Sequence, residues 1–361
     1  MILDDVEAVA DRAEFAEVLA GVAQRASPRN TVVARADAAA TGEIDSALWE
    51  RLIGEIGVLG LAVPDELGGA GATWAEIAVL MEQVGRSTAA VPALGAILAV
   101  EAITASGDTA ALAELLPAMV AGTTIGTVWT GTGLTADATG SVSGEARLVL
   151  DGGHADLVLA QAETGTGAAW FAIETVGAAV RRHETLDLVR DLATITFTDA
   201  PARAIAVADP GGLAARLRDL GLVAVAAEQL GVAEQALADS VEYAGVREQF
   251  RRVIGSFQAL KHLVADVATE TDLARSMVEH AVWAAVSSPD DLPEAAAMAM
   301  LAASRAAVLA SGENVQIHGG IGFSWEHPAH LLFRKARSND RLLGSPADLA
   351  DRILSAHGVR P

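Results

Sequence analysis

The sequence predicts an α+β protein, mostly α, with a small β region between two helical blocks. Residues 1–120 carry apolar side chains at helical spacing, interrupted by glycine and proline turns. From about Thr123 short runs of alternating polarity replace this pattern, and helical spacing returns after Pro201. We therefore expect an N-terminal helical domain at 1–120, a middle β domain at 121–203 and a C-terminal four-helix bundle at 204–361.

Local signals place several of these elements. Thr73, followed three residues later by Glu76, has the spacing of a helix N-cap, and a helix should run from there to Arg86. The runs expected as strands are Ile125–Trp129, Ala146–Leu150, Leu157–Ala160, Ala169–Ile173 and Ala193–Phe197. The helices expected in the last block are Leu220–Gly245, Phe257–Val286, Pro293–Ile317 and Pro346–Ala356.

Composition excludes several classes of function. Acidic residues outnumber basic residues by 47 to 25, and the net charge of −22 argues against nucleic acid or an anionic membrane as a partner. The absence of cysteine excludes disulfides and thiolate chemistry. The eight histidines form no helical pair with metal-ligand spacing, so no metal site is expected.

The sequence also predicts a cytoplasmic protein. The first residues, Met1-Ile-Leu-Asp-Asp-Val-Glu, are acidic where a signal peptide would be basic. The most apolar windows, Gly221–Ala227 and Ala295–Ala310, are interrupted by polar residues before they reach the roughly 18 residues that a membrane span needs. Neither a signal peptide nor a membrane span is therefore expected.

Positive charge gathers in one stretch of this acidic chain. Residues 243–266 contain Arg247, Arg251, Arg252 and Lys261 around a connection between two expected helices. A guanidinium at a helix end presents a planar fork of donors, which suits a phosphate or pyrophosphate. Charge alone is more often a solvated helix end with ordinary ion pairs.

A glycine-rich segment follows about seventy residues after Arg247. Its sequence is Gln316-Ile-His-Gly319-Gly320-Ile-Gly-Phe323. Glycines let backbone amides approach a ligand that a side chain would keep away. Alone, such a segment is most often a turn.

Together the two segments resemble the acyl-CoA dehydrogenase family. Arg247-Glu-Gln-Phe, Ile254-Gly-Ser-Phe-Gln and Lys261-His-Leu-Val-Ala-Asp resemble its flavin-contacting signature, and the glycine-rich segment looks like its Gln-x-x-Gly-Gly element. The helical, β, helical order is similar to the family's domain order. The resemblance implies FAD as cofactor and the α,β-desaturation of an acyl-CoA thioester. It also implies an oligomer built by the last domain, and electron-transfer flavoprotein as a partner.

The resemblance further implies how the cofactor is held. In the family, the corresponding arginine and Gln-x-x-Gly-Gly element reach across the subunit interface to the pyrophosphate and adenosine end of a neighbour's FAD. The arginine would neutralise the pyrophosphate, the two glutamines would hydrogen-bond the polar end, and the two glycines would admit it closely. The phenylalanine would pack against the adenine or the interface. The cofactor-binding residues implied in this way are Arg247, Phe250, Gln258, Gln316, Gly319 and Gly320.

The catalytic base of the family has no counterpart in this sequence. Most members carry a glutamate in a Tyr-Glu-Gly-Thr run after the Gly-Gly element, and the matching residue here is Leu343. In a minority the base lies on the helix before the arginine, at the position of Gly221. A base must reach the substrate carbon directly, and neither residue takes a proton. Asp219 and Asp340 are nearby substitutes, but each is more often a helix-end or surface acid, so no catalytic residue is assigned.

The β domain departs from the family as well. Members carry a Thr-Glu-Pro-x-x-Gly-Ser-Asp loop and a Trp-Ile-Thr-Asn run, which hold the flavin ring and the acyl end. In the corresponding residues, 129–138 and 150–156, the acid, the proline and the Trp-Ile-Thr-Asn run are missing. The sequence therefore argues against a complete flavin cleft within this chain.

Three interpretations remain open. In the first, the chain completes the FAD site of a distinct, catalytically complete subunit in a heterotetramer. In the second, it is a self-sufficient homotetramer with Asp219 or Asp340 as an unusual base. In the third, it is a non-enzymatic scaffold that has the fold and binds no flavin. The retained Arg247 and Gln316 elements favour the first, because fold stability alone does not require them together.

Overall fold

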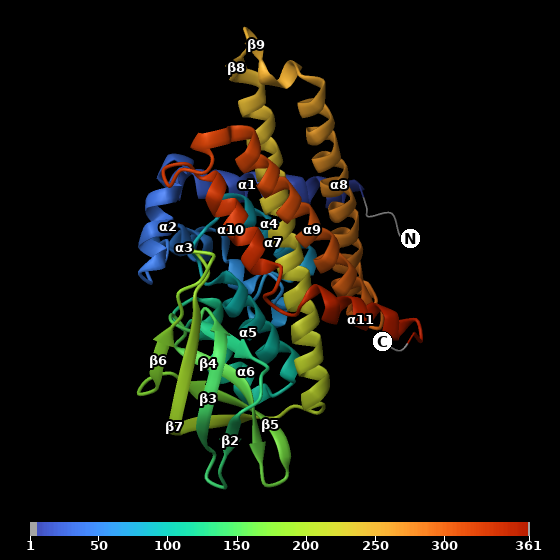
Figure 1. Cartoon of the computed structure of the whole chain (residues 1–361). Coiled ribbons are helices and arrows are strands. Elements are labelled where there is room, and N and C mark those ends of the chain that lie inside the picture. The colour runs from blue at the N-terminus through green and yellow to red at the C-terminus, as the bar shows by residue number, and fades with distance from the viewer. Residues whose placement is uncertain (1–5, 360–361) are drawn as a thin grey trace.

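The chain is mostly helical; its seven-stranded sheet lies at one end of the molecule, and the short hairpin of β8 and β9 lies at the other end (Figure 1). The structure is a computed structural model that describes residues 6–359. The predicted helix start is confirmed, because Thr73 and Glu76 cap α4 reciprocally. The N-terminal helices are α1 (Val6–Ala26), α2 (Val32–Ala40), α3 (Ser46–Arg51), α4 (Trp74–Ser87), α5 (Ala93–Ser106) and α6 (Thr109–Val120).

The β region is one seven-stranded sheet. It follows the order β1-β4-β2-β3-β7-β5, and β5 also pairs with β4, so five of its strands close into a ring around a core of their own. The predicted strand runs correspond to β1, β3, β4, β5 and β7. The sequence does not predict β2, which is three residues long, or β6, which is exposed throughout. The strands are β1 (Gly126–Trp129), β2 (Leu134–Ala136), β3 (Ser141–Leu150), β4 (Leu157–Thr164), β5 (Gly167–Glu174), β6 (Ala179–Arg182) and β7 (Leu192–Ile205).

The last block holds two long core helices, α7 and α9, with the other helices packed on them. α7 starts before the predicted Leu220, because Asp209 caps its first turn and Pro210 takes the first helical position. The sequence analysis does not predict α10, a helix of 11 residues with an apolar face. The elements are α7 (Pro210–Val246), β8 (Glu248–Gln249), β9 (Arg252–Val253), α8 (Gln258–Ser287), α9 (Leu292–His318), α10 (Ala329–Asn339) and α11 (Pro346–Ala356). The domain boundaries drawn from the sequence stay a prediction.

α7 and α9 are more apolar over a longer stretch than the sequence analysis allowed. By length and composition, Pro210–Val246 and Leu292–Ile321 qualify as candidate membrane spans, so the expectation that no window reaches that length is wrong. Of their apolar windows, 89% and 61% are buried inside the protein. A helix that is apolar on all sides also serves as the core helix of a large soluble protein, and burial favours that explanation.

α4 and α7 cross with their backbones in contact. A Cβ atom added to Gly85 of α4 would lie 2.0 Å from the carbonyl oxygen of Glu228. A Cβ atom added to Gly231 of α7 would lie 2.0 Å from the carbonyl oxygen of Glu82. Glycine at both positions therefore permits the crossing. The main hydrophobic core runs through both helical blocks at this junction.

Candidate functional site

The two predicted motifs lie at the same end of the helical bundle. Arg247 follows α7 as its C-cap, and its N–H donates to the carbonyl of Tyr243 at 2.9 Å. The Tyr243 ring stacks on His318, the last residue of α9, with centroids 4.3 Å apart. This stack brings the arginine segment and the glycine segment together. We call this end of the protein, residues 241–258 and 316–327, the bundle tip.

A short hairpin carries the predicted aromatic residue at the bundle tip (Figure 1). Phe250 and Arg251 form its turn with φ angles of 52° and 64°, a region that side chains other than glycine rarely adopt. Phe250 is 85% exposed, and Gln258, the first residue of α8, is also exposed. An exposed ring on a strained turn suits contact with another molecule.

The glycine segment is an open turn. Gly319 follows α9 with φ of 64°, and Gly320 continues in a short 3-10 turn. Among the described residues, no atom lies within 4 Å of a Cβ atom added to either glycine. Gln316 is exposed in the turn of helix before them. Open backbone, two glutamine amides and a guanidinium together fit the donors that a pyrophosphate-bearing cofactor needs.

Apolar side chains surround these polar groups. The large apolar residues exposed at the bundle tip are Val241, Val246, Phe250, Val253, Ile321, Phe323 and Trp325. Phe250 and Phe323 are each 85% exposed. Apolar side chains gathered around polar groups are typical of a surface that another protein covers. All six predicted cofactor-binding residues lie on this exposed end.

The residues at the two possible base positions lie side by side. A Cβ atom added to Gly221 would lie 2.9 Å from Cδ1 of Leu343 and 3.5 Å from Cδ1 of Leu98. The two base positions, each located in the sequence by counting from a different motif, therefore lie next to each other in the structure. Leucine side chains fill that place, and neither position supplies a carboxyl group.

The two substitute acids are engaged elsewhere. The carboxylate of Asp219 is buried and lies 2.5 Å from Arg352 of α11. Burial raises the pKa of Asp219, and the ion pair with Arg352 opposes that rise. Asp340 pairs with its neighbour Arg341 at 3.3 Å near the end of α10. An ion pair with a neighbouring arginine therefore accounts for each of the two acids without a catalytic role.

The β-domain segments that should hold a flavin ring pack on this chain instead. Trp129 is buried, and its Nε1–H donates to the carbonyl of Arg147 at 2.9 Å. A Cβ atom added to Gly131 would lie 2.5 Å from that indole, so the loop folds against its own tryptophan. Asp151, between β3 and β4, accepts the N–H of Gly95 in α5 at 3.0 Å. Because these groups are committed to internal contacts, they do not fit a flavin ring.

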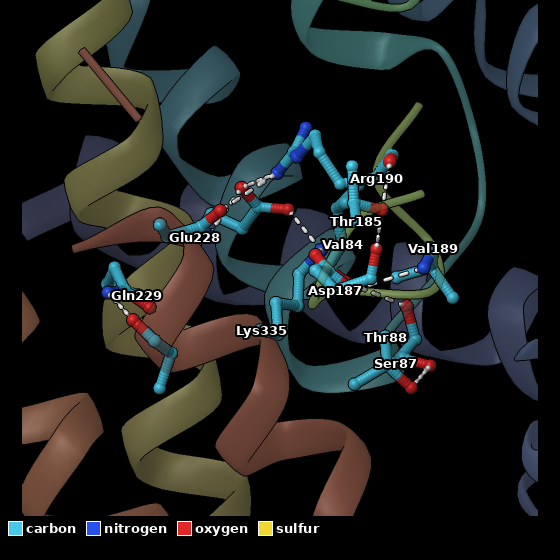
Figure 2. A network of polar contacts seen from close by, with 12 residues as sticks. Val84, Ser87, Thr88, Thr185, Asp187, Val189, Arg190, Glu228, Gln229 and Lys335 are labelled. Atoms are coloured by element: carbon cyan, nitrogen blue, oxygen red, sulfur yellow. Dashed lines mark hydrogen bonds and ion pairs between the residues drawn. The ribbon is translucent and has the colours of Figure 1, made fainter. Parts of the chain in front are cut away.

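A buried ionic network joins the β region to the bundle (Figure 2). Glu228 of α7 pairs with Arg190 and with Lys335 of α10, whose Nζ lies 2.7 Å from its Oε1. Lys335 also lies 3.5 Å from Asp187, and Asn339 donates to Glu228 at 3.1 Å. Burial acts to raise the pKa of Glu228, but the two cations hold that pKa below its ordinary value. Glu228 therefore stays charged in the core.

Sequence reasoning did not find this network. Its signal is a Glu228-Gln229 pair inside an otherwise apolar run of α7, since charged residues are rarely buried unless paired. Gln229 strengthens the same junction, because its Nε2–H donates to the carbonyl of Ala336 in α10 at 3.0 Å. Arg190 of this network also acts on Asp151. Burial raises the pKa of Asp151 to about 6, and the positive charge of Arg190 opposes that rise.

Comparison of the sequence with protein-family models identifies the family to which the chain belongs. Residues 12–123 match the acyl-CoA dehydrogenase N-terminal domain, and residues 219–355 match the acyl-CoA dehydrogenase C-terminal domain. The chain therefore belongs to the acyl-CoA dehydrogenase family, whose members are FAD-dependent oxidoreductases of lipid metabolism. The family, the fold class, the enzyme class and the cofactor that the sequence predicts are confirmed.

Individual relatives cover nearly the whole chain. Acyl-CoA dehydrogenase IpdE2 of Mycobacterium tuberculosis is 35% identical over 338 residues, which is 92% of this chain and 93% of that protein. A variant of the Tcur3481–Tcur3483 steroid ACAD has a TM-score of 0.84 and 31% identity, covering 96% of this chain and 99% of its own. The ChsE4–ChsE5 complex from Mycobacterium tuberculosis has a TM-score of 0.86 and 28% identity, covering 97% and 98%. Each of these two structures is named for a pair of different chains.

Proposed function

We propose that this chain is one subunit of a heteromeric acyl-CoA dehydrogenase, and that it completes the FAD site of a related chain that carries the catalytic base. The observation that carries the proposal is the contact between Leu343 and Gly221. Both positions of the family's base meet there without a carboxyl group. The predicted cofactor-binding residues stay on an exposed surface. A chain that has this surface but lacks the base can contribute to catalysis by binding the FAD of a second chain that carries the base.

The comparisons support a heteromer as the assembly to test. Two structural neighbours are named for pairs of different chains, so we expect a heterotetramer, with a homotetramer as the alternative. One of them is named a steroid ACAD, which makes a polycyclic acyl-CoA thioester the first substrate class to try. We further infer a cytoplasmic location from the soluble fold of the family, and electron-transfer flavoprotein as the acceptor of electrons from the assembled enzyme.

In this arrangement the chain acts on the distant end of the cofactor and not on the reacting carbons. Bound FAD supplies the hydride acceptor for α,β-desaturation. Arg247 would place a permanent positive charge against the pyrophosphate. Gly319 and Gly320 allow backbone N–H groups to approach it, because they carry no side chain. The amides of the two glutamines would hydrogen-bond the polar end, and Phe250 would pack against the adenine or the interface.

Arg247→Ala is expected to release FAD from the assembled complex. Hydrogen bonds to charged groups contribute roughly 1.5–3 kcal/mol each. The affinity of the complex for FAD should therefore fall at least about tenfold. The measurement is the flavin absorbance of each complex after gel filtration, followed by titration of the flavin-free complex with FAD.

Arg218→Ala is the matched control for this experiment. Arg218 is exposed on the same helix, α7, at the end away from the bundle tip. The control removes the same charge from the protein and leaves the tip intact, so its flavin content should be that of the native complex. Full flavin content in the Arg247→Ala complex, or an equal loss in both variants, would contradict the role of Arg247.

The isolated chain is expected to leave acyl-CoA thioesters unoxidised. Co-expression with a related chain that carries a glutamate at either base position should give turnover with an artificial electron acceptor. Turnover by this chain alone that Asp219→Asn or Asp340→Asn abolishes would favour the self-sufficient enzyme instead. A lack of flavin in every preparation, alone or with a partner chain, would favour the non-enzymatic scaffold.

A further inference from the structure

Three rings link the two halves of the bundle tip. Tyr243 of α7 stacks on His318 of α9 with centroids 4.3 Å apart, and His318 contacts the ring of His327 at 4.5 Å. The two histidines stand at the two ends of the loop that contains the glycine turn. Their contact closes this loop at its base, and the tyrosine ties the closed loop to the turn that holds Arg247. We call Tyr243, His318 and His327 the ring column.

Each histidine of the ring column is fixed by a second contact. His318 is 8% exposed, and its Nδ1 lies 2.8 Å from the carbonyl oxygen of Asn314, to which an Nδ1–H donates. Nδ1 of His327 accepts the N–H of Ala329, the first residue of α10, at 3.2 Å. A neutral His327 therefore carries its proton on Nε2. These contacts hold the loop closed before any ligand arrives.

We propose that the ring column positions the glycine loop and Arg247 for the dinucleotide, and that protonation of His327 loosens it. This inference rests on the proposed function, because the position of the loop matters only if the bundle tip binds a neighbouring chain's FAD. The rings act through Arg247 and the loop backbone, so they are positioning residues. A loop that is ordered before binding loses less conformational freedom on binding, which strengthens the complex.

Titratable and charged groups from several elements surround His327. They are His318 from α9, Asp239 from α7, Arg29, which pairs with that aspartate, and His330 from α10. Burial lowers the pKa of His327 below its ordinary value of 6.5, and His318, Arg29 and His330 add to this, while Asp239 opposes it. A histidine with a lowered pKa supports the closed state above its ordinary pKa, and that support is lost as the pH falls below it. Protonation at Nδ1 also removes the acceptor of the α10 hydrogen bond.

The test compares variants that keep a ring with variants that remove it, all in the assembled complex. His318→Phe keeps the stack, so FAD affinity at about pH 8 should stay within about twofold of native. His327→Phe removes the histidine whose pKa burial lowers, so between about pH 8 and about pH 5.5 its affinity should fall less than that of the native complex. His318→Ala should lose roughly three- to tenfold of the affinity across the same range. Tyr243→Leu should match His318→Ala, which keeps the test open if one variant fails to fold.

Three comparisons decide the outcome. His357→Ala, beyond the last turn of α11, should leave both the affinity and the pH profile unchanged. Native affinity with a native pH profile in His318→Ala and Tyr243→Leu would overturn the proposal, as would a lower thermal midpoint with unchanged FAD affinity. If Arg247→Ala releases FAD and the ring variants do not, only the ring column is wrong. If Arg247→Ala keeps FAD, the proposed function itself fails.

Discussion

Replacing Glu228 with glutamine should lower the free energy of unfolding by about 3–5 kcal/mol. Glu228 is 0% exposed and lies between two cations, Arg190 and Lys335. Glutamine would keep the shape of the side chain but leave Lys335 with Asp187 alone and Arg190 with only the more distant charges of Asp151 and Asp187. A buried charge without a partner is costly, because it has lost its water and gained nothing in return. Urea denaturation of the full chain measures the effect.

A second substitution should restore part of this loss. Glu228→Gln combined with Lys335→Met removes one charge of each sign and leaves Asp187 and Arg190 as a balanced pair. A double-mutant cycle should therefore give a coupling energy of about 1–3 kcal/mol. Glu145→Gln is the surface control, because Glu145 pairs with an exposed arginine in the β region and such pairs contribute about 0–1 kcal/mol. Equal losses in the two glutamine variants would show that burial is not the cause.

The ionic network also matters for the bundle tip. Glu228 lies on the helix that ends at Arg247, and Lys335 lies on the helix that follows the glycine loop. The ion pair between them fixes the two helices on which the two halves of the tip are built. Gln229 adds a neutral hydrogen bond across the same pair of helices. The tip is therefore held by contacts in the protein core as well as by the ring column.

Local patterns in the sequence predict the elements whose causes are local. The Thr73 cap and the main strands follow from spacing within a few residues, and the structure confirms them. The sequence also identifies Leu343 and Gly221 as the two base positions, but only the folded chain shows that these residues lie side by side. Only the expected length of the apolar windows was wrong, because a few polar residues do not stop these helices from reaching the length of a span, and their burial favours a place in the core.

The sequence could not predict the ionic network or the ring column, because both depend on how distant parts of the chain pack together. Arg190 lies in a connection between strands, Glu228 in α7 and Lys335 in α10, and only tertiary packing brings them together. His318 and His327 are close in sequence, but no spacing rule says that their rings meet. A Glu-Gln pair in an apolar run and two histidines around a glycine turn are the signals that a sequence offers, and neither signal identifies the residues that it contacts.

Alanine at Gly231 should destabilise the protein by about 3 kcal/mol or more, because overpacking usually costs about 1–3 kcal/mol and here the obstacle is backbone. The new methyl group would lie 2.0 Å from the carbonyl oxygen of Glu82. Alanine normally strengthens a helix, but its gain over glycine of about 1 kcal/mol is too small to compensate. Gly85→Ala, whose methyl group would lie 2.0 Å from the carbonyl oxygen of Glu228, should cost a similar amount. The shift in urea midpoint measures both.

Gly312→Ala is the matched control, because Gly312 lies inside α9 and no described atom lies within 4 Å of an added Cβ atom. It should stabilise the protein by up to about 1 kcal/mol, so the same substitution has opposite signs at the two places. Gly85→Ala and Gly231→Ala together should cost less than the sum of the two, because the first methyl group already separates α4 from α7. A stabilised Gly231→Ala variant would mean that the backbones do not touch. Since Glu228 belongs to both the crossing and the ionic network, displacing α7 at the crossing should also weaken its ion pairs.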